Sequence, residues 1–184
     1  MNRIIKGMLF LCLLVIPNHL TAQTGNHKST ILPAEIMQKF IGQWEGTCKT
    51  WFMPGVLADS SKITGEFKWI LNERFVRHTY DSKIKGQKRK GEETIIFNQA
   101  KEKWEVTWLD EFHMNYGILF SEGSGDGNEF MVFGNYATSP GKPDWGWETK
   151  YKFVDDNHLK IISYNVTPGG EKAKAIEVDY RRIR

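Results

Sequence analysis

Apolar and polar residues alternate one by one along most of this chain, and this period of two predicts β-strands. The alternation is clearest in three runs, residues 63–71, 103–110 and 147–153. Weaker runs cover residues 44–52, 75–81, 92–97, 113–121, 129–136, 158–166 and 173–182. We therefore expect about ten strands.

Short turn sequences separate these runs, such as Asn98-Gln99 and Pro168-Gly169-Gly170. Short connections indicate that neighbouring strands pair antiparallel. Only residues 33–40 have a helical period, with Pro33 suited to the first turn and Phe40 on the apolar face. The pattern predicts an all-β fold: a single antiparallel up-and-down β-barrel of about ten strands with a short N-terminal helix.

The first residues predict a secretory signal peptide over 1–22. They have a basic head, an apolar stretch over 7–16 and the small residue Ala22 before the expected cleavage point. Residues 23–32 are polar and predict a flexible leader, and 33–184 predict one barrel domain. We expect the protein to be exported, to the periplasm or beyond. The mature chain has no apolar segment long enough to predict a transmembrane helix.

Charge and cysteine content narrow the function classes. Arg3 and Lys6 supply two of the three net positive charges, so the mature chain carries about +1, and nothing favours nucleic acid as a partner. Cys48 is the one cysteine after residue 22, which leaves no internal disulfide and predicts a small buried apolar residue. The 13% aromatic content, with seven Trp, suits a cavity or a thick core.

Three stretches carry a family resemblance. They are Gly42-Gln43-Trp44 after the helix, Trp104-x-x-x-Trp108-x-Asp110, and the run from Tyr151 to Arg182. Together they resemble the bacterial secreted family called domain of unknown function 1579, which belongs with the lipocalin-like (calycin) barrels. The resemblance covers roughly residues 33–184 and implies a barrel that encloses a ligand. It implies no catalytic residues, and the basic hairpin 83–90 departs from the family pattern.

In lipocalin-like barrels an Arg of the last strand often lies over the indole of the Gly-x-Trp motif. The resemblance therefore implies that Trp44 and Arg182 close one end of the barrel. Such a cation–π contact is worth roughly 0.5–2 kcal/mol.

Candidate ligand-binding residues are the aromatic and polar side chains that interrupt the strand pattern, because such groups orient ligands in apolar cavities. They are Trp69, Arg77, His78, Tyr80, Trp108, His113, Tyr116, Tyr151 and Tyr164. Alternation alone does not decide which face of each strand points inward. The basic residues of hairpin 83–90, Arg89 among them, predict a solvated turn.

These features favour a barrel that binds a small, largely apolar molecule without catalysis. One alternative is a haem- or metal-binding barrel that uses His78, His113 or His158 as ligand; no zinc or calcium motif accompanies them. Another is an enzyme, an isomerase or hydrolase, with its active site in the cavity. Asp110, Glu111 and His113 are candidates for an acid–base group at the mouth of such a cavity, although strand parity separates Asp110 from His113 unless the turn between the strands reverses them. A structural domain without a ligand is the fourth interpretation, and the oligomeric state stays open.

Overall fold

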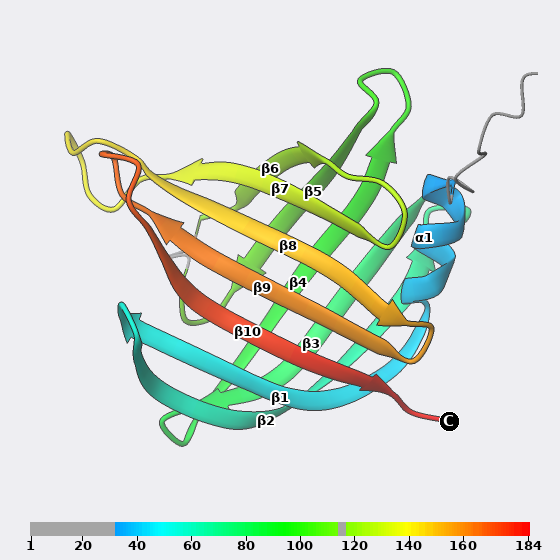
Figure 1. Cartoon of the computed structure of the whole chain (residues 1–184), viewed down its shortest axis with the longest axis horizontal. Coiled ribbons are helices and arrows are strands. Elements are labelled where there is room, and N and C mark those ends of the chain that lie inside the picture. Colours follow the sequence, from blue (N-terminus) through cyan, green and yellow to red (C-terminus); the bar gives the residue numbers. More distant parts are fainter. Residues whose placement is uncertain (1–31, 114–116) are drawn as a thin grey trace, which may run out of the picture.

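Ten strands close into one barrel in this computed structural model, which describes residues 32–113 and 117–184 (Figure 1). The elements are α1 (Pro33–Phe40), β1 (Gly42–Met53), β2 (Val56–Ile70), β3 (Phe75–Ile84), β4 (Gln87–Asn98), β5 (Lys103–Asp110), β6 (Leu119–Ser124), β7 (Glu129–Tyr136), β8 (Trp145–Asp155), β9 (His158–Val166) and β10 (Lys172–Arg182). Each strand pairs antiparallel with the next, and β10 returns to pair with β1. The predicted fold class is confirmed.

The alternation of the sequence becomes an inner and an outer face of the wall, because successive side chains of a strand point in opposite directions. Along β5, Trp104, Val106 and Trp108 are buried while their neighbours are not. Aromatic rings fill the interior near α1, where Trp104 stacks on Phe130 with 4.1 Å between ring centroids. This part of the barrel is a packed core.

Helix α1 covers that end of the barrel (Figure 1). Phe40 is fully buried and packs on Phe67 and Phe153, with centroids 5.1 and 4.8 Å away. The Trp44 indole donates to the Phe40 carbonyl over 2.8 Å, and the Arg182 guanidinium lies 4.2 Å over the Trp44 ring. Arg182 on β10 also donates to the carbonyl of Lys39 at 2.6 Å, and this hydrogen bond holds α1 against the end of the barrel. The geometry is that of a sealed end.

The predicted and observed elements differ at β2 and β4, which begin at Val56 and Gln87 and not at residues 63 and 92, and again after β5. The helix has its predicted bounds, whereas the strand expected over 113–121 is instead β6, Leu119–Ser124, because the chain turns at Asp110. The predicted signal peptide, 1–22, and Tyr116 lie outside the described residues, as does the predicted leader except for its last residue.

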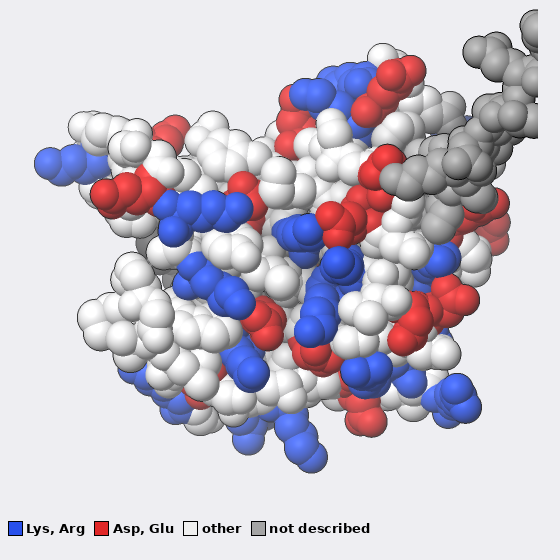
Figure 2. Space-filling model, viewed as in Figure 1, with Lys and Arg blue, Asp and Glu red and all other residues white. Residues whose placement is uncertain are grey.

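Charged side chains of both signs are interspersed over the face of the barrel in Figure 2. Many join neighbouring strands, for example Lys150 on β8 to Glu129 on β7 at 2.7 Å. Exposed pairs of this kind contribute about 0–1 kcal/mol each. Within the described residues, no helix is long and apolar enough to cross a membrane.

Candidate functional site

The barrel interior away from α1 contains two adjoining cavities. The inner chamber is walled by aliphatic side chains, among them Ile63, Val106, Val132, Ile161, Ile176 and Val178. The mouth lies beyond it and is lined by aromatic side chains that include Trp51, Phe52 and Tyr136. Trp108, Leu119 and Trp147 line both parts.

Trp108 and Trp147 stand at the boundary between chamber and mouth. Their rings stack with centroids 5.1 Å apart and planes 18° from parallel. The free volume is about 40 Å³ in the chamber and about 150 Å³ in the mouth. The chamber therefore holds roughly three waters or one slim group, while a volume like that of the mouth holds a benzene-sized ring.

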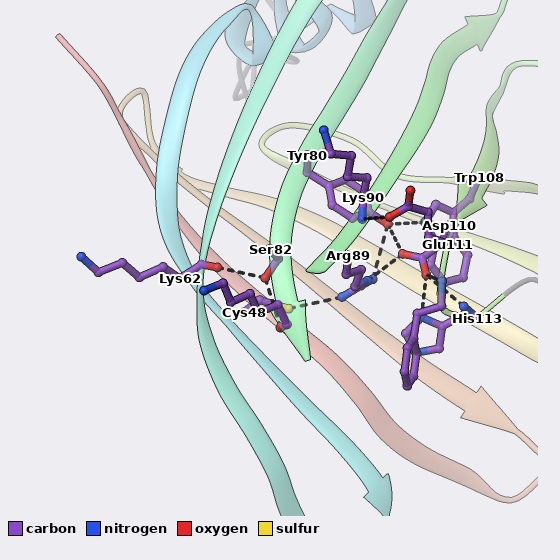
Figure 3. Close-up of polar contacts among 12 residues, drawn as sticks. Cys48, Lys62, Tyr80, Ser82, Arg89, Lys90, Trp108, Asp110, Glu111 and His113 are labelled. Carbon is purple, nitrogen blue, oxygen red and sulfur yellow. Dashed lines mark hydrogen bonds and ion pairs between the residues drawn. The ribbon is translucent and has the colours of Figure 1, made fainter. Parts of the chain in front are cut away.

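One buried polar cluster, the Arg89 cluster, comprises Tyr80, Arg89, Trp108, Asp110 and His113 (Figure 3). Arg89 Nε donates to Asp110 Oδ2 at 2.7 Å, and the Tyr80 hydroxyl donates to the same oxygen at 2.6 Å. The Trp108 indole donates to the Tyr80 oxygen at 2.8 Å. The Asp110 side chain is fully buried and that of Arg89 is 3% exposed, so water does not screen this ion pair.

The turn after β5 completes the Arg89 cluster. Asp110 Oδ1 accepts the backbone N–H groups of Phe112 and His113 at 2.7 and 2.9 Å, an arrangement that reverses the chain. The reversal brings His113 Nδ1 to 3.1 Å from the same oxygen. The turn thus supplies the reversal without which strand parity would have separated Asp110 from His113.

Electrostatics keep this pair ionised. Burial alone would raise the pKa of the Asp110 carboxyl, but the bond with His113, the charge of Arg89 and the bond from Tyr80 hold it well below its usual range. Burial opposes the charge on Arg89, yet the nearby Tyr80, Asp110 and Cys48 groups raise its pKa above the ordinary value. The charges of Arg89 and Asp110 thus cancel inside the barrel.

Cys48 lies beside this cluster on β1. Arg89 Nη1 is 3.7 Å from its sulfur, and the residue is 1% exposed. Burial raises the pKa of the thiol, although Arg89 acts in the opposite direction. Cys48 is therefore a buried thiol, as predicted, and not an activated nucleophile.

A second buried polar cluster, the Glu93 cluster, comprises His78, Glu93, Tyr151 and Tyr180. Glu93 Oε2 lies 2.7 Å from His78 Nδ1, and Oε1 accepts the Tyr151 hydroxyl at 2.7 Å. His78 Nε2 lies 3.2 Å from the Tyr180 hydroxyl, and the imidazole stacks on Phe67 at 3.8 Å. Of these four residues, His78, Glu93 and Tyr151 line the inner chamber.

The hydrogen bonds of the Glu93 cluster are all satisfied by one assignment. His78 donates from Nδ1 to Glu93, and Tyr180 donates its hydroxyl proton to Nε2. An imidazolium would use both nitrogens as donors and leave the Tyr180 proton without an acceptor among the described residues. Burial raises the pKa of Tyr151 and of Tyr180 well above the ordinary value, so both hydroxyls stay protonated. One hydrogen-bond assignment thus joins all four side chains of the cluster.

A glycine makes room for each cluster. A Cβ at Gly65 would lie 2.6 Å from the Tyr180 hydroxyl and 2.9 Å from His78 Nε2. A Cβ at Gly91 would collide with the Tyr80 ring. A glycine within a strand marks such a close approach.

The structure brings together some of the sequence-predicted residues and separates others. His78, Tyr80, Trp108 and Tyr151 line the chamber, and His113 lines the mouth. Trp69 instead reaches helix α1, where its indole donates to Gln38 at 3.2 Å. 

Arg77 and Tyr164 do not line the chamber or the mouth. Arg77 is 3.3 Å from Glu92, its neighbour on β4, and Lys172 Nζ lies 4.2 Å over the Tyr164 ring. Both residues occupy strand positions next to inward-facing ones, so their side chains point outward.

Sequence reasoning missed two charged residues of the chamber, Arg89 and Glu93. The expectation that Arg89 belongs to a solvated turn was wrong, because Arg89 is buried. It shares the inward parity of Glu93 and Ile95 on β4. Extending the predicted strand from Ile95 towards its N-terminus would have placed Arg89 on the inward face. The lysines on either side of Arg89 made the segment resemble a solvated turn instead.

A histidine that binds a metal ion or haem iron needs a ring nitrogen without another partner. Both nitrogens of His78 already have partners. His158 does not line the chamber, and its Nε2 lies 2.9 Å from Asp179 Oδ1. In the described ranges, no three His, Cys, Asp or Glu side chains gather as a metal site would require. Among these histidines, only His113 borders a cavity with a nitrogen, Nε2, that has no described partner.

Comparisons with known proteins place the fold and the family. The crystal structure of Rv2717c from M. tuberculosis matches with a TM-score of 0.59 at 13% identity, over 84% of this chain and 99% of that one. A DUF3598 protein of unknown function from Nostoc punctiforme covers 83% of this chain and is fully covered itself, at 10% identity and a TM-score of only 0.26. No curated protein matches.

The Rv2717c likeness supports the barrel fold alone. The model of one protein family, "Protein of unknown function (DUF1579)", matches residues 33–182, which is most of the chain. This protein therefore belongs to the DUF1579 family.

Proposed function

We propose that this protein is an exported lipocalin-like barrel that binds a small, largely apolar molecule in its chamber and mouth without transforming it. The observation that carries the proposal is the free space in the barrel away from α1, where an aliphatic chamber adjoins an aromatic mouth at Trp108 and Trp147. Concave apolar cavities with a few fixed polar groups are the usual form of small-molecule sites.

The two ends of the barrel support this proposal by contrast. Near α1 the interior is filled by rings such as Phe40, Trp104 and Phe130, which a purely structural barrel would need throughout. Small side chains replace such rings farther along, where Ser121, Thr149 and Ser163 line the chamber. Space left unfilled beside such small side chains costs packing energy, which a bound ligand would restore.

Native mass spectrometry of the purified protein is the first test. We expect a complex that is a few hundred daltons heavier than the chain, together with quenching of tryptophan fluorescence when the extracted ligand is added back. A ligand-free mass from every host and growth condition, with no response to apolar probes, would contradict the proposal. The mass of the chain also tests export, because removal of residues 1–22 would lower it.

A matched pair of variants tests whether the chamber is the site. Ile161 lines the chamber, whereas its neighbour Ile162 faces outward. Ile161→Phe should fill the free volume and weaken ligand binding at least tenfold, and Ile162→Phe should leave binding unchanged. Thermal unfolding of both variants separates lost binding from lost folding, since overpacking costs about 1–3 kcal/mol.

Proton-transfer catalysis is a second candidate function, favoured by one observation. Glu93 and His78 are 2.7 Å apart in the chamber wall, within the reach that acid–base chemistry requires. Glu93 would exchange a proton with the ligand, as an isomerase does. Incubating the extracted ligand with the protein in D₂O tests this: deuterium at a carbon position, lost in Glu93→Gln, supports an isomerase, and an unlabelled ligand contradicts it.

A further inference from the structure

We propose that the ligand carries an ammonium group, which the Glu93 carboxylate binds in the inner chamber, while an aromatic or short apolar body occupies the mouth. This inference rests on the proposed function, because it names the class of molecule that the same cavity takes. It follows from the charges of the cavity, the free lone pairs of Glu93 and the order of residues along the wall.

Charge is the first argument. The charged side chains that line the inner chamber are Arg89 and Glu93. Arg89 is neutralised by Asp110 at 2.7 Å, whereas Glu93 faces His78 and two tyrosine hydroxyls belong to its cluster. The described partners of the Glu93 carboxylate are an imidazole and a tyrosine hydroxyl, so no Arg or Lys side chain faces it as Arg89 faces Asp110. A cationic ligand group would take that place beside the buried carboxylate.

Free acceptor capacity is the second argument. A carboxylate has about four lone-pair sites. Each oxygen of Glu93 accepts one described bond, Oε1 from Tyr151 and Oε2 from His78. The remaining sites can accept N–H donors from a ligand, and the Glu93 side chain keeps 10% of its surface exposed. An ammonium group has three donors and no acceptor, so it suits a site whose free valences are all acceptors.

Position is the third argument. Trp108 is the direct cross-strand neighbour of Glu93, and both side chains face inward. Directly opposed Cβ atoms lie about 4.5–5.5 Å apart. Glu93 therefore lies beside Trp108 in the chamber wall, deeper in the barrel than Arg89. The chamber admits only a slim group, which a primary ammonium on a methylene chain is, and the mouth has the volume for one aromatic ring.

Arg89 is the reason to consider an anionic ligand instead, and its bonds argue against that class. Its Nε–H is used by Asp110, one terminal nitrogen faces Cys48 and the other faces the Tyr80 oxygen at 3.4 Å. A carboxylate bound there would compete with Asp110, which is fully buried and cannot be rehydrated in place. It would also add a second negative charge to a cavity that already contains Glu93.

Three probes that differ only in their head group test the proposal. They are 3-phenylpropylamine, 3-phenylpropan-1-ol and 3-phenylpropanoate, each titrated at neutral pH by tryptophan fluorescence and calorimetry. We expect the amine to bind at least about tenfold more tightly than the alcohol, because charge-assisted hydrogen bonds are the stronger ones. The carboxylate should bind most weakly.

A matched pair of carboxamide variants assigns the preference to one residue. Glu93→Gln keeps the shape of the side chain and removes its charge, so the amine should lose its advantage over the alcohol. Glu92→Gln is the control, since Glu92 is the next residue on β4 and interacts with Arg77 on the outside. It should leave the ranking unchanged. If Glu93→Gln does not fold, the ranking of the three probes on the unaltered protein still decides.

Two results would overturn the proposal. In the first, the alcohol or the carboxylate binds as tightly as the amine; the cavity would then still be a binding site, with another ligand class. In the second, none of the three probes binds at millimolar concentration. Native mass spectrometry then decides separately whether the proposed function survives with a different ligand.

Discussion

The Arg89 and Glu93 clusters occupy the same wall of the barrel, and they differ in charge balance. Their defining residues, Arg89 and Glu93, are four positions apart on β4, which is roughly 14 Å along an extended strand. In the first cluster a guanidinium and a carboxylate are in contact, whereas in the second a carboxylate faces an imidazole and a tyrosine hydroxyl. Both clusters contain a tyrosine hydroxyl that burial keeps protonated.

This difference separates a structural role from a recognition role. The two carboxylate oxygens of Asp110 accept hydrogen bonds from Arg89, from Tyr80 and from the turn that follows β5. Removing any of these partners should therefore destabilise the fold. Glu93 has acceptor sites left over and borders the free space. Stability should therefore respond most to the Arg89 cluster, and ligand choice should respond most to Glu93.

The largest effect is expected from Arg89→Met, because it leaves Asp110 buried without its cation. Breaking a buried pair in this way typically costs about 3–5 kcal/mol in the free energy of unfolding. Urea unfolding measures the loss. Lys88→Met, at the exposed neighbouring position, should stay within about 0.5 kcal/mol. A loss below about 1 kcal/mol in Arg89→Met would contradict the structural role of this cluster.

Double variants sharpen the comparison. Arg89→Met combined with Asp110→Asn removes both charges and keeps the turn acceptor, so the combined loss should fall short of the sum by about 1–3 kcal/mol. The double variant of Arg89→Met and Glu93→Gln changes one residue in each cluster. The two losses in the free energy of unfolding should therefore add within about 0.5 kcal/mol. Strong coupling in the second pair would mean that the two clusters act as one network.

Acid should weaken the fold through Asp110. Its native pKa lies below that of an Asp in the unfolded chain, about 3.9. The unfolded chain therefore takes up the proton first, and the stabilisation present above about pH 5 is lost progressively as the pH falls further. Urea unfolding from pH 7 to pH 3 should show a shallower decline for Asp110→Asn than for the unaltered protein. Parallel declines would show that other carboxyl groups are responsible.

The smallest effect is expected from Tyr151→Phe, which removes the donor to Glu93 Oε1. The loss in stability should be about 1 kcal/mol, near the net value of one hydrogen bond. Affinity for 3-phenylpropylamine should be kept or increase, because an acceptor site becomes free. A drop in affinity as large as that of Glu93→Gln would instead place Tyr151 among the groups that hold the ligand.

The barrel fold could be predicted from the sequence because the alternation of apolar and polar residues repeats in every strand. Alternation predicted about ten strands, a local apolar pattern predicted the helix 33–40, and the family resemblance implied the Trp44–Arg182 contact. Apolar residues report their inward direction reliably, since burial is what selects them. That logic fails for polar residues on the same face, which is why Arg89 was assigned to solvent.

The polar interior depends on long-range partners that no local pattern encodes. His78 and Tyr180 are 102 positions apart, and Tyr151 lies 58 positions from Glu93. His113 joins Asp110 only because the chain reverses after β5. Gly65 and Gly91 were the usable hints, as glycines at inward positions of strands leave room for a bulky partner.

The pairing of β10 with β1 has a kinetic consequence. Trp44 and Arg182 are register partners, so the two ends of the domain meet in the last step of closure. Contacts of such sequence separation make folding slow, and until β10 arrives the edges of β1 and β9 stay unpaired and prone to aggregation. A chain threaded through a membrane from its N-terminus would therefore emerge almost completely before its barrel could close.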